Sequence, residues 1–268
     1  MKECHRWLNC DDMDGIIVKE LIGLGAVKAV YRAVWAAMNI TYSILNNPNF
    51  IDDFQSGLEM LKLLNPSPYV TQLIGFCPSE NVIWTEYHPL GNAVNIVDKI
   101  HKTGFRDNVH VRLKLCLNYA LLLEYLHSGP AGCRVMCDSN TLEKTLSQLL
   151  VTNELSLLLN DVDALPEINS EQKTIRCGNR NLSGNFIAPE QRASDPHVLE
   201  GYNEKTDIWK AASVCEYFIS DVSNSEIIRY KLFFLHKKCK SVDVNERPSA
   251  TQLAAQYIKI MHELDDEL

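Results

Sequence analysis

The sequence lacks several features that would each define a class of protein. Its 268 residues contain no run of the ~18–20 apolar residues that a membrane-spanning helix needs, so we expect no such helix in this chain. Lys and Arg total 26 against 34 Asp and Glu, and the formal net charge of −8 argues against a basic, nucleic-acid-binding surface. None of the nine cysteines forms a CxxC pair, which argues against zinc-ribbon or thioredoxin chemistry.

The composition that is present indicates an ordinary globular protein. Hydrophobic residues make up 46% and charged residues 22% of the chain, which excludes wholesale disorder. Nine cysteines fit either buried free thiols or a few disulfides in an oxidising compartment, with one thiol left over. The sequons Asn39-Ile40-Thr41 and Asn181-Leu182-Ser183 fit a secretory lumen, although chance alone supplies one or two in such a chain.

The first third of the chain reads as strands, one helix, and then further strands. Residues 17–45 are rich in β-branched and aromatic residues and predict strands joined by tight turns. Apolar residues recur at helical spacing over 50–64, and Asn65-Pro66-Ser67-Pro68 ends that helix. Residues 70–76 and 82–87 are short apolar runs that predict two more strands.

The remainder of the chain is mostly helical. We expect a long helix over 111–127, a small hairpin over 149–159, a long loop over 166–186, and helices from Tyr202 onward. This order predicts an α+β fold of two lobes: a small β-rich N-lobe over about 1–86, a hinge over about 86–91, and a larger helical C-lobe over about 92–268. A cleft between such lobes is the default ligand site.

A glycine-containing turn interrupts the first strands. Gly23-Leu24-Gly25 lies in a strand–turn–strand pattern, where the absence of a Cβ lets backbone amides approach phosphate oxygens. A dinucleotide-binding turn would need a third glycine and a following helix, whereas Ala29-Val30-Tyr31 favours a strand. Taken alone, this turn is weak evidence for phosphate binding, and an ordinary hairpin turn is the favoured interpretation.

Downstream motifs follow the order typical of protein kinases. Glu86-Tyr87 precedes the lobe boundary as a hinge would, and Ala188-Pro189-Glu190, Asp207-Ile208-Trp209 and Arg247-Pro248 follow in kinase order. At a finer level the chain resembles the protein O-mannose kinase family over nearly its whole length. The motifs that carry this resemblance are Cys137-Asp138-Ser139-Asn140, Lys144-Thr145-Leu146-Ser147-Gln148, Asn160-Asp161-Val162-Asp163, Ala188-Pro189-Glu190-Gln191, Glu204-Lys205-Thr206-Asp207-Ile208-Trp209-Lys210 and Glu246-Arg247-Pro248.

The resemblance implies a bilobal protein-kinase-like fold and an ATP-dependent carbohydrate kinase. That family phosphorylates the 6-hydroxyl of mannose in an O-linked GalNAc–GlcNAc–Man trisaccharide on α-dystroglycan, using ATP and a divalent metal, Mg²⁺ or Mn²⁺. Its members are type II membrane proteins whose kinase domain lies in the lumen of the endoplasmic reticulum. We therefore expect this chain to be a luminal portion without its anchor, and favour a monomer that binds no nucleic acid.

By register with kinases, the nucleotide side of the site consists of Gly23, Gly25, Lys28, Glu86 and Tyr87. The usual β3 lysine position falls on Ser43, so we expect Lys28, one strand earlier, to reach the α- and β-phosphates, as in with-no-lysine kinases. The usual αC glutamate position falls on Gly57. Asp53, one turn earlier, is a weak candidate partner for Lys28, and a solvated helix N-terminal acid is the favoured alternative.

The transfer side of the site is expected around Asp138, as the group that accepts or orients the mannose hydroxyl proton. Met136-Cys137 replaces His-Arg, so we expect activity without phosphorylation of the activation segment. Asp161 is the firmest candidate metal ligand, and Gln148 is expected at the metal-binding asparagine position. Asn140 is the rival of Gln148, and a buried structural glutamine is a further alternative.

Other residues near these motifs keep two interpretations open. Asp163 is either a ligand of a second ion or a turn cap, and Lys144 is either a γ-phosphate contact or a surface lysine. Glu190 with Arg247, and Asp207 with Trp209, are expected to be scaffold. For disulfides we consider Cys177 with Cys239 and Cys10 with Cys77, which spacing alone cannot decide.

Two further functions compete with a carbohydrate kinase. The missing β3 lysine, HRD arginine and αC glutamate favour a pseudokinase scaffold that binds nucleotide or glycan without transfer, and a protein Ser/Thr kinase is a weaker third hypothesis. The retained Lys28, Asp138, Gln148 and Asp161 favour transfer, because a scaffold has no need of these groups. Residues 139–147 and 166–186 are our candidates for contacts with the sugar.

Overall fold

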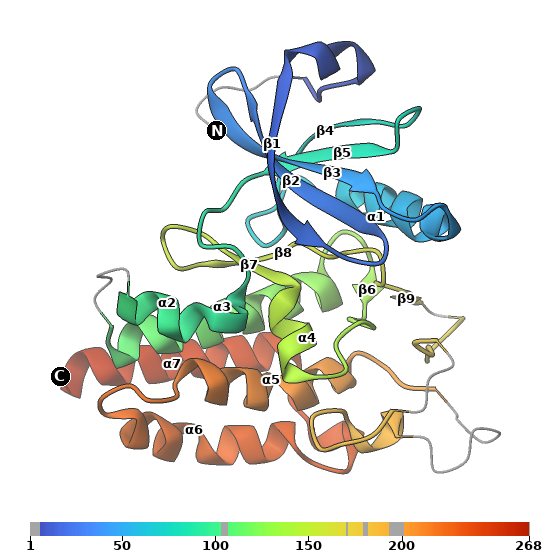
Figure 1. Cartoon of the computed structure of the whole chain (residues 1–268). Helices are drawn as coiled ribbons and strands as arrows, with labels where there is room; N and C mark the ends of the chain where they lie inside the picture. The colour runs from blue at the N-terminus through green and yellow to red at the C-terminus, as the bar shows by residue number, and fades with distance from the viewer. Residues whose placement is uncertain (1–5, 103–106, 170, 179–181, 193–200, 268) are drawn as a thin grey trace. The chain divides into compact units, whose positions relative to one another are not determined.

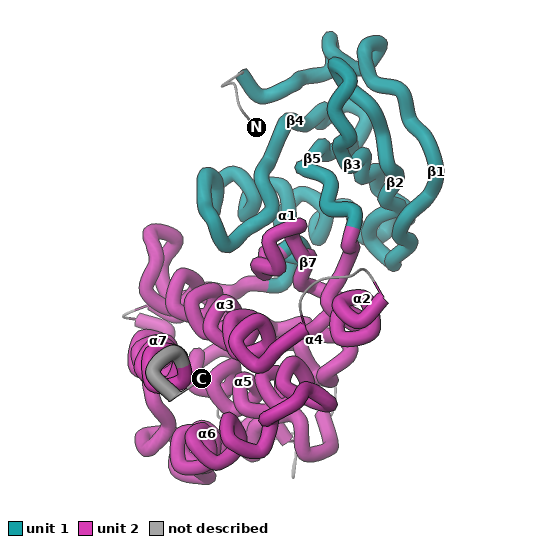
Figure 2. The backbone as a smooth tube through the Cα atoms, turned by 90° about the vertical axis from the view of Figure 1, so that its left-hand side faces the viewer, with its two compact units in different colours: residues 1–89, 160–164 teal, residues 90–159, 165–268 magenta. Residues whose placement is uncertain are grey.

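The computed structural model describes residues 6–102, 107–169, 171–178, 182–192 and 201–267, with side chains described as far as Leu264 (Figure 1). The chain divides into two compact units (Figure 2). Unit 1 comprises residues 1–89 together with 160–164, and unit 2 comprises 90–159 and 165–268. Unit 1 is therefore built from two separate stretches of sequence.

Unit 1 contains a five-stranded antiparallel sheet in the order β1-β2-β3-β5-β4. Its elements are β1 (Ile16–Leu24), β2 (Lys28–Trp35), β3 (Met38–Leu45), α1 (Ile51–Leu64), β4 (Leu73–Cys77) and β5 (Val82–Glu86), with 3₁₀ turns at Cys10–Gly15 and Pro48–Phe50. The strands and the helix predicted from the sequence are thereby confirmed. α1 ends at Asn65, whose side-chain amide donates to the carbonyls of Leu61 and Thr71.

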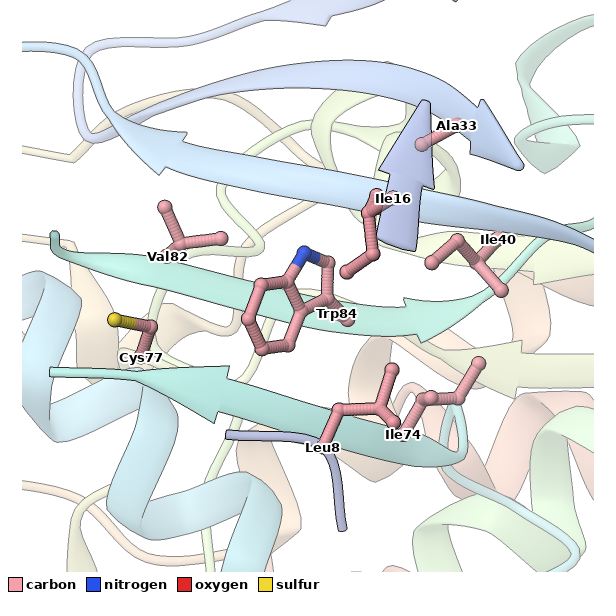
Figure 3. Packing of buried hydrophobic residues seen from close by; sticks show 8 residues of the cluster. All are labelled: Leu8, Ile16, Ala33, Ile40, Ile74, Cys77, Val82 and Trp84. Carbon is pink, nitrogen blue, oxygen red and sulfur yellow. The ribbon is translucent and has the colours of Figure 1, made fainter. Parts of the chain in front are cut away.

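One face of this sheet forms the core of unit 1. Trp84 on β5 is fully buried at the centre of a cluster that comprises Leu8, Ile16, Ala33, Ile40, Ile74, Cys77 and Val82 (Figure 3). Because side chains alternate along a strand, the residues between these positions point to the opposite face. Lys28, at the start of β2, and Ser43, on β3, belong to that opposite face.

Unit 2 is mainly helical. Its helices are α2 (Ile96–Lys102), α3 (Val109–Ser128), α4 (Leu142–Ser147), α5 (Lys205–Phe218), α6 (Ser225–Cys239) and α7 (Ala250–Glu267). Short strands β6 (Cys133–Arg134) and β9 (Glu167–Ile168) pair with each other, as do β7 (Leu149–Val151) and β8 (Leu157–Leu159), and 3₁₀ turns lie at Ala93–Asn95, Pro189–Gln191 and Val244–Glu246. α3 packs against α5 and α7. The predicted long helix, small hairpin and late helices are confirmed, whereas α2 and α4 were not predicted.

In the part of the chain that the structure describes, no helix combines the length and the apolar character needed to cross a membrane.

A buried ion pair anchors the segment that contains Ala188-Pro189-Glu190. The Arg247 side chain has no exposed surface, and its Nη1 and Nη2 donate to the two carboxylate oxygens of Glu190 at 2.5 and 2.8 Å. Its Nε donates to the carbonyl of Ser241 at 2.9 Å. The predicted contact between Glu190 and Arg247 is confirmed, and its two parallel hydrogen bonds fix the geometry of the segment.

Three disulfides join six of the described cysteines in pairs: Cys10–Cys77, Cys116–Cys215 and Cys137–Cys177. The predicted Cys10–Cys77 pair is confirmed, and the predicted Cys177–Cys239 pair is wrong, because Cys177 bonds Cys137. The three disulfides indicate a luminal or extracellular domain.

The other described cysteines, Cys133 and Cys239, are free. Burial raises the pKa of the Cys133 thiol to about 11 and that of Cys239 to about 12, so both are protonated and unreactive at neutral pH. Cys4, the ninth cysteine, lies outside the described residues.

Of the two sequons, the first lies on β3, where Asn39 is exposed and its side-chain oxygen accepts a hydrogen bond from Arg32 at 2.8 Å. Asn181 of the second sequon lies outside the described residues.

Candidate active site

The first feature of the candidate site is the ammonium group of Lys28, which lies in unit 1. Its ammonium nitrogen lies 3.0 Å from Oδ1 of Asp161 and 3.8 Å from Oδ2 of Asp163, and all three side chains are largely buried. Burial alone would lower the pKa of Lys28, but the two carboxylates outweigh it, so the pKa is raised above its ordinary value. The ammonium therefore stays charged at neutral pH, as a group that neutralises phosphates must.

The register of the sheet explains how Lys28 can stand in for a lysine on β3. Lys28 pairs with Leu45, and Val30 pairs with Ser43, so Lys28 and Ser43 lie on the same face of adjacent strands. Ser43 itself is buried and carries no charge. A lysine at position 28 thus projects from the same face of the sheet as a lysine at position 43 would. Its position along the strands differs by two residues.

The place of the missing αC glutamate is occupied by Asp163. A Cβ added to Gly57 on α1 would lie 3.3 Å from the Cβ of Asp163, so a side chain at position 57 would press against Asp163. The favoured interpretation of Asp53 as a solvated helix N-terminal acid is confirmed: Asp53 is exposed in the first turn of α1, and Lys28 pairs instead with Asp161 and Asp163. The signal available in the sequence was the Asp-x-Asp spacing, which places a second carboxylate two residues from Asp161.

The glycine turn closes the hairpin of β1 and β2. The Gly25 amide donates to the Lys28 carbonyl at 2.9 Å, and Asn46 donates to the carbonyls of Gly25 and Val27 at 2.8 Å each. A strand follows, so the dinucleotide-binding alternative is wrong. Phosphate binding by Gly23 and Gly25 stays a prediction.

Glu86 ends β5 and is engaged within unit 1. Its Oε1 accepts from the Gln72 amide at 2.9 Å and lies 3.2 Å from Nε2 of His88. Burial raises the pKa of Glu86, but His88 and the Gln72 amide outweigh this effect, so the pKa is lowered and the carboxylate stays ionised. The Glu86 carboxylate is thus already paired. The predicted nucleotide contact of Glu86 and Tyr87 would therefore be made by their backbone groups.

Asp138 lies in unit 2 beside a helix that sequence reasoning treated only as an insertion. The inserted residues form α4, whose N-cap Thr141 accepts from the backbone amide of Lys144. Nζ of Lys144 lies 2.6 Å from Oδ2 of Asp138, and both side chains are partly exposed. A solvent-accessible carboxylate held beside a cation suits a group that must meet a substrate hydroxyl, and the γ-phosphate role of Lys144 stays a prediction.

Gln148 and Asn140, the rival amides, differ in their partners. Gln148 is buried at the end of α4, and its amide nitrogen donates to the backbone carbonyl of Asp138. The side-chain oxygen of Asn140 is buried with no hydrogen-bond partner in the described part of the chain. Both amides therefore lie on the segment that carries Asp138, and Gln148 also holds that segment in place.

The oxygen donors present fit a divalent cation of the magnesium type. Among the described residues, no group of three or more His, Cys, Asp and Glu side chains could hold a metal ion as a closed cage. Within unit 1, the carboxylates of Asp161 and Asp163 are the oxygen donors of this kind beside Lys28. Mg²⁺ commonly takes one or two carboxylates and completes its shell with water and phosphate oxygens, so this sparse set is adequate.

The features of the site follow one another along the chain in the order that defines a protein-kinase-like phosphotransferase. A glycine turn and a lysine come first, an aspartate on a separate segment and the carboxylates that pair with the lysine come next, and the anchored Ala-Pro-Glu follows. No protein-family model matches the sequence. The chain is, however, 40% identical over 272 residues to the protein O-mannose kinase of Gallus gallus, covering 97% of this chain and 77% of that protein. It is 39% identical over 281 residues to the protein O-mannose kinase of Homo sapiens, covering 100% and 79%.

A more distant relative is mitogen-activated protein kinase kinase kinase 7 of Homo sapiens, 25% identical over 206 residues that cover 75% of this chain and 31% of that protein. The chain belongs to the protein O-mannose kinase family. Membership of this family implies that the chain is a kinase that uses ATP.

Proposed function

We propose that this chain transfers the γ-phosphoryl group of ATP to the 6-hydroxyl of an O-linked mannose. The observation that carries the proposal is the ion cluster of Lys28, Asp161 and Asp163, which retains the charges for nucleotide use although the usual lysine and glutamate positions are lost. A scaffold that merely bound a partner would not need a buried ammonium held by two carboxylates. The sugar acceptor is supported by the protein O-mannose kinases to which the chain is similar.

The chemistry of the proposed reaction assigns a role to each residue. The mannose O6 attacks the γ-phosphorus, the bond to the β–γ bridging oxygen breaks, and Asp138 accepts or orients the departing hydroxyl proton. Lys28 neutralises charge on the α- and β-phosphates. When bound, Mg²⁺ or Mn²⁺ would neutralise the β- and γ-phosphate oxygens, and Asp161 and Gln148 are the residues proposed to hold it.

The proposed acceptor is the GalNAc–GlcNAc–Man trisaccharide on α-dystroglycan, and the proposed location is the lumen of the endoplasmic reticulum, with the full-length protein anchored in its membrane. The three disulfides support the luminal part of this proposal. The net charge of −8 suits a neutral sugar better than a polyanionic acceptor.

Incubation of the purified chain with Mg-ATP and the trisaccharide tests the proposal, with mannose 6-phosphate detected by mass spectrometry. We expect Asp138→Asn and Asp161→Asn to lower the rate at least about 10²–10⁴-fold, because each removes a carboxylate that acts on the reacting groups. The matched control is Glu226→Gln, which changes an exposed acid in the first turn of α6 and should keep the wild-type rate.

Three outcomes would contradict the proposal. ATP binding without any mannose 6-phosphate would support the pseudokinase scaffold instead. Phosphorylation of peptides that carry no sugar would support a protein Ser/Thr kinase. Wild-type rates in the Asp138 variant would remove that residue from the transfer step.

A further inference from the structure

A buried polar cluster lies directly beneath the segment that carries Asp138. Asp207 and Lys210 are one turn apart on α5 and neither exposes any surface, and Ser139, next to Asp138, is equally buried. All of these residues belong to unit 2. The proposed function gives Lys210 and Ser139 no role.

Hydrogen bonds connect this cluster to both sides of Asp138. Nζ of Lys210 donates to the hydroxyl oxygen of Ser139 at 2.6 Å, and that hydroxyl donates to the Met136 carbonyl at 2.5 Å. Nζ of Lys210 also lies 3.5 Å from the Met136 carbonyl and 3.3 Å from Oδ1 of Asp207. The Met136 amide donates to Oδ2 of Asp207 at 3.0 Å. The residues on either side of Cys137 and Asp138 are therefore both held from α5.

A fully buried lysine is costly, so its presence needs a reason. Burial lowers the pKa of Lys210, and Asp207 offsets this effect only in part. Burial also favours the neutral form of Asp207, but Lys210, His127 and the Met136 amide together lower its pKa. Replacing a buried ion pair by apolar residues often leaves stability unchanged or improves it, so stability alone does not account for the cluster.

The identity of the neighbouring side chains suggests what the reason is. Met136 and Cys137 stand where kinases have His and Arg, so this segment lacks two polar side chains that could fix it in place. Met136 is buried, and Cys137 is bonded to Cys177. Among the described residues, Asp207 and Lys210 bind the backbone of this segment. Asp207 accepts from the Met136 amide, and Lys210 contacts the Met136 carbonyl both directly and through the Ser139 hydroxyl.

We propose that Lys210, acting through the hydroxyl of Ser139, is a positioning residue that fixes the carboxylate of Asp138 for phosphoryl transfer. This inference rests on the proposed function of Asp138. It assigns no contact with ATP or sugar to Lys210 and requires no proton transfer by it. The lysine fits the task because its ammonium offers three donors on a long stem, and the oxygens of Ser139, Met136 and Asp207 accept them.

Two variants separate the positioning role from the folding role. Lys210→Met keeps the length of the side chain and removes its donors. Ser139→Ala removes the link to the segment and leaves Lys210 paired with Asp207. The matched control is Thr206→Val, which removes a buried hydroxyl on the same helix whose partner is the carbonyl of Asn203.

We expect both test variants to lower kcat for mannose 6-phosphate formation by roughly 10- to 100-fold and to leave the KM values for ATP and trisaccharide unchanged. A mutation far from the reacting atoms that misplaces a catalytic group by about 1 Å can lower the rate by that much. Combined in one chain, the two changes should cost no more than the larger single change, since they break the same connection. The Thr206→Val control should keep the wild-type kcat.

Hydrogen exchange measured by mass spectrometry gives a readout that does not depend on activity. We expect faster exchange over 136–140 in Ser139→Ala and Lys210→Met, and wild-type exchange there in Thr206→Val. Absence of product from the wild-type chain would refute the proposed function, while altered exchange would still show that the cluster holds the segment.

The positioning role would be overturned if Ser139→Ala, which retains the ion pair on α5, showed wild-type kcat and wild-type exchange over 136–140. It would also be overturned if the loss of activity in every variant, Thr206→Val included, followed only the loss of folded protein in a thermal melt.

Discussion

At the scale of single residues, the site keeps its charges while changing their positions. Lys28 lies on the same face of the sheet as position 43, where the usual lysine is expected, and Asp163 packs against Gly57, which stands at the usual αC glutamate position. Asp163, whose carboxylate lies 3.8 Å from the Lys28 ammonium, also packs closely against position 57, where glycine leaves space for it. Lys28, Asp163 and Gly57 thus lie together within unit 1.

Exchange of Lys28 for methionine should reduce nucleotide use strongly. We expect kcat/KM for ATP to fall by about 10²-fold or more, because the ammonium charge at the phosphates is lost while the side chain keeps its volume. Steady-state kinetics with varied ATP measures this. Ser43→Ala is the matched control on the same face and should change kcat/KM little; equal losses in the two variants would contradict the assignment of Lys28.

Single residues also show where prediction from sequence stops. Lys28, Asp138 and Asp161 follow from motif order, which survives changes in neighbouring residues. The partnership of Lys28 with Asp163 did not follow, because a turn that is distant in sequence supplies the acid. The hydrogen bond from Gln148 to the Asp138 carbonyl depends on α4, whose formation within an insertion the spacing did not indicate.

At the scale of elements, α6 and α7 meet through a partly buried histidine. Nε2 of His236 on α6 lies 2.9 Å from the hydroxyl of Tyr257 on α7, and Tyr257 is fully buried. Burial lowers the pKa of His236 to about 4, with a smaller contribution from Lys240. The folded chain therefore holds this imidazole neutral over a range in which the unfolded chain protonates it.

Acid should accordingly destabilise the folded chain through His236. Its contribution is complete above the unfolded pKa near 6.5 and is lost as the pH falls towards 4, because the unfolded state then binds the additional proton. We expect a loss of about 3 kcal/mol in the free energy of unfolding over this window. Denaturant melts from pH 7 to 4 measure it.

His236→Gln should flatten this dependence on pH, because an amide cannot take up the proton. His262→Gln, a change at an exposed position on α7, should keep the wild-type slope. Identical slopes in wild-type and His236→Gln proteins would assign the acid sensitivity to other groups.

Elements differ in how far the sequence specified them. The five strands of unit 1, α1 and α3 were predicted, because their apolar periodicity persists over enough residues to distinguish strand from helix. α2 and α4 have seven and six residues, too few for a helical pattern to stand out. The strand order was not predicted, because pairing depends on contacts between distant segments.

At the scale of the whole molecule, disulfides link positions that are far apart in the sequence. The separations are 67, 99 and 40 residues for Cys10–Cys77, Cys116–Cys215 and Cys137–Cys177. Counting cysteines indicated an oxidising compartment as one of two interpretations; the sequence suggested the Cys10–Cys77 pair, and the folded positions identified the other two. Closing such long loops restricts the unfolded chain strongly.

Reduction should therefore lower the thermal stability of the chain markedly. The chain-entropy model gives about 4–5 kcal/mol for each of the three disulfides. Thermal unfolding with and without a strong reductant measures the change in Tm. Cys133→Ser is the control, since that thiol is free and the substitution should leave the effect of reductant unchanged. If the reductant did not change Tm, the disulfides would not stabilise the fold.

The discontinuity of unit 1 has a consequence for how this protein can be divided or recombined. Residues 160–164 fold with 1–89, and they bring both carboxylates that hold Lys28. A fragment that stopped at residue 89 would retain the lysine and leave its ammonium without those counterions. The N-terminal unit therefore cannot be exchanged as one continuous segment. A chimaera with another kinase would have to include both stretches of chain, because recombination at a single crossover would separate Lys28 from Asp161 and Asp163.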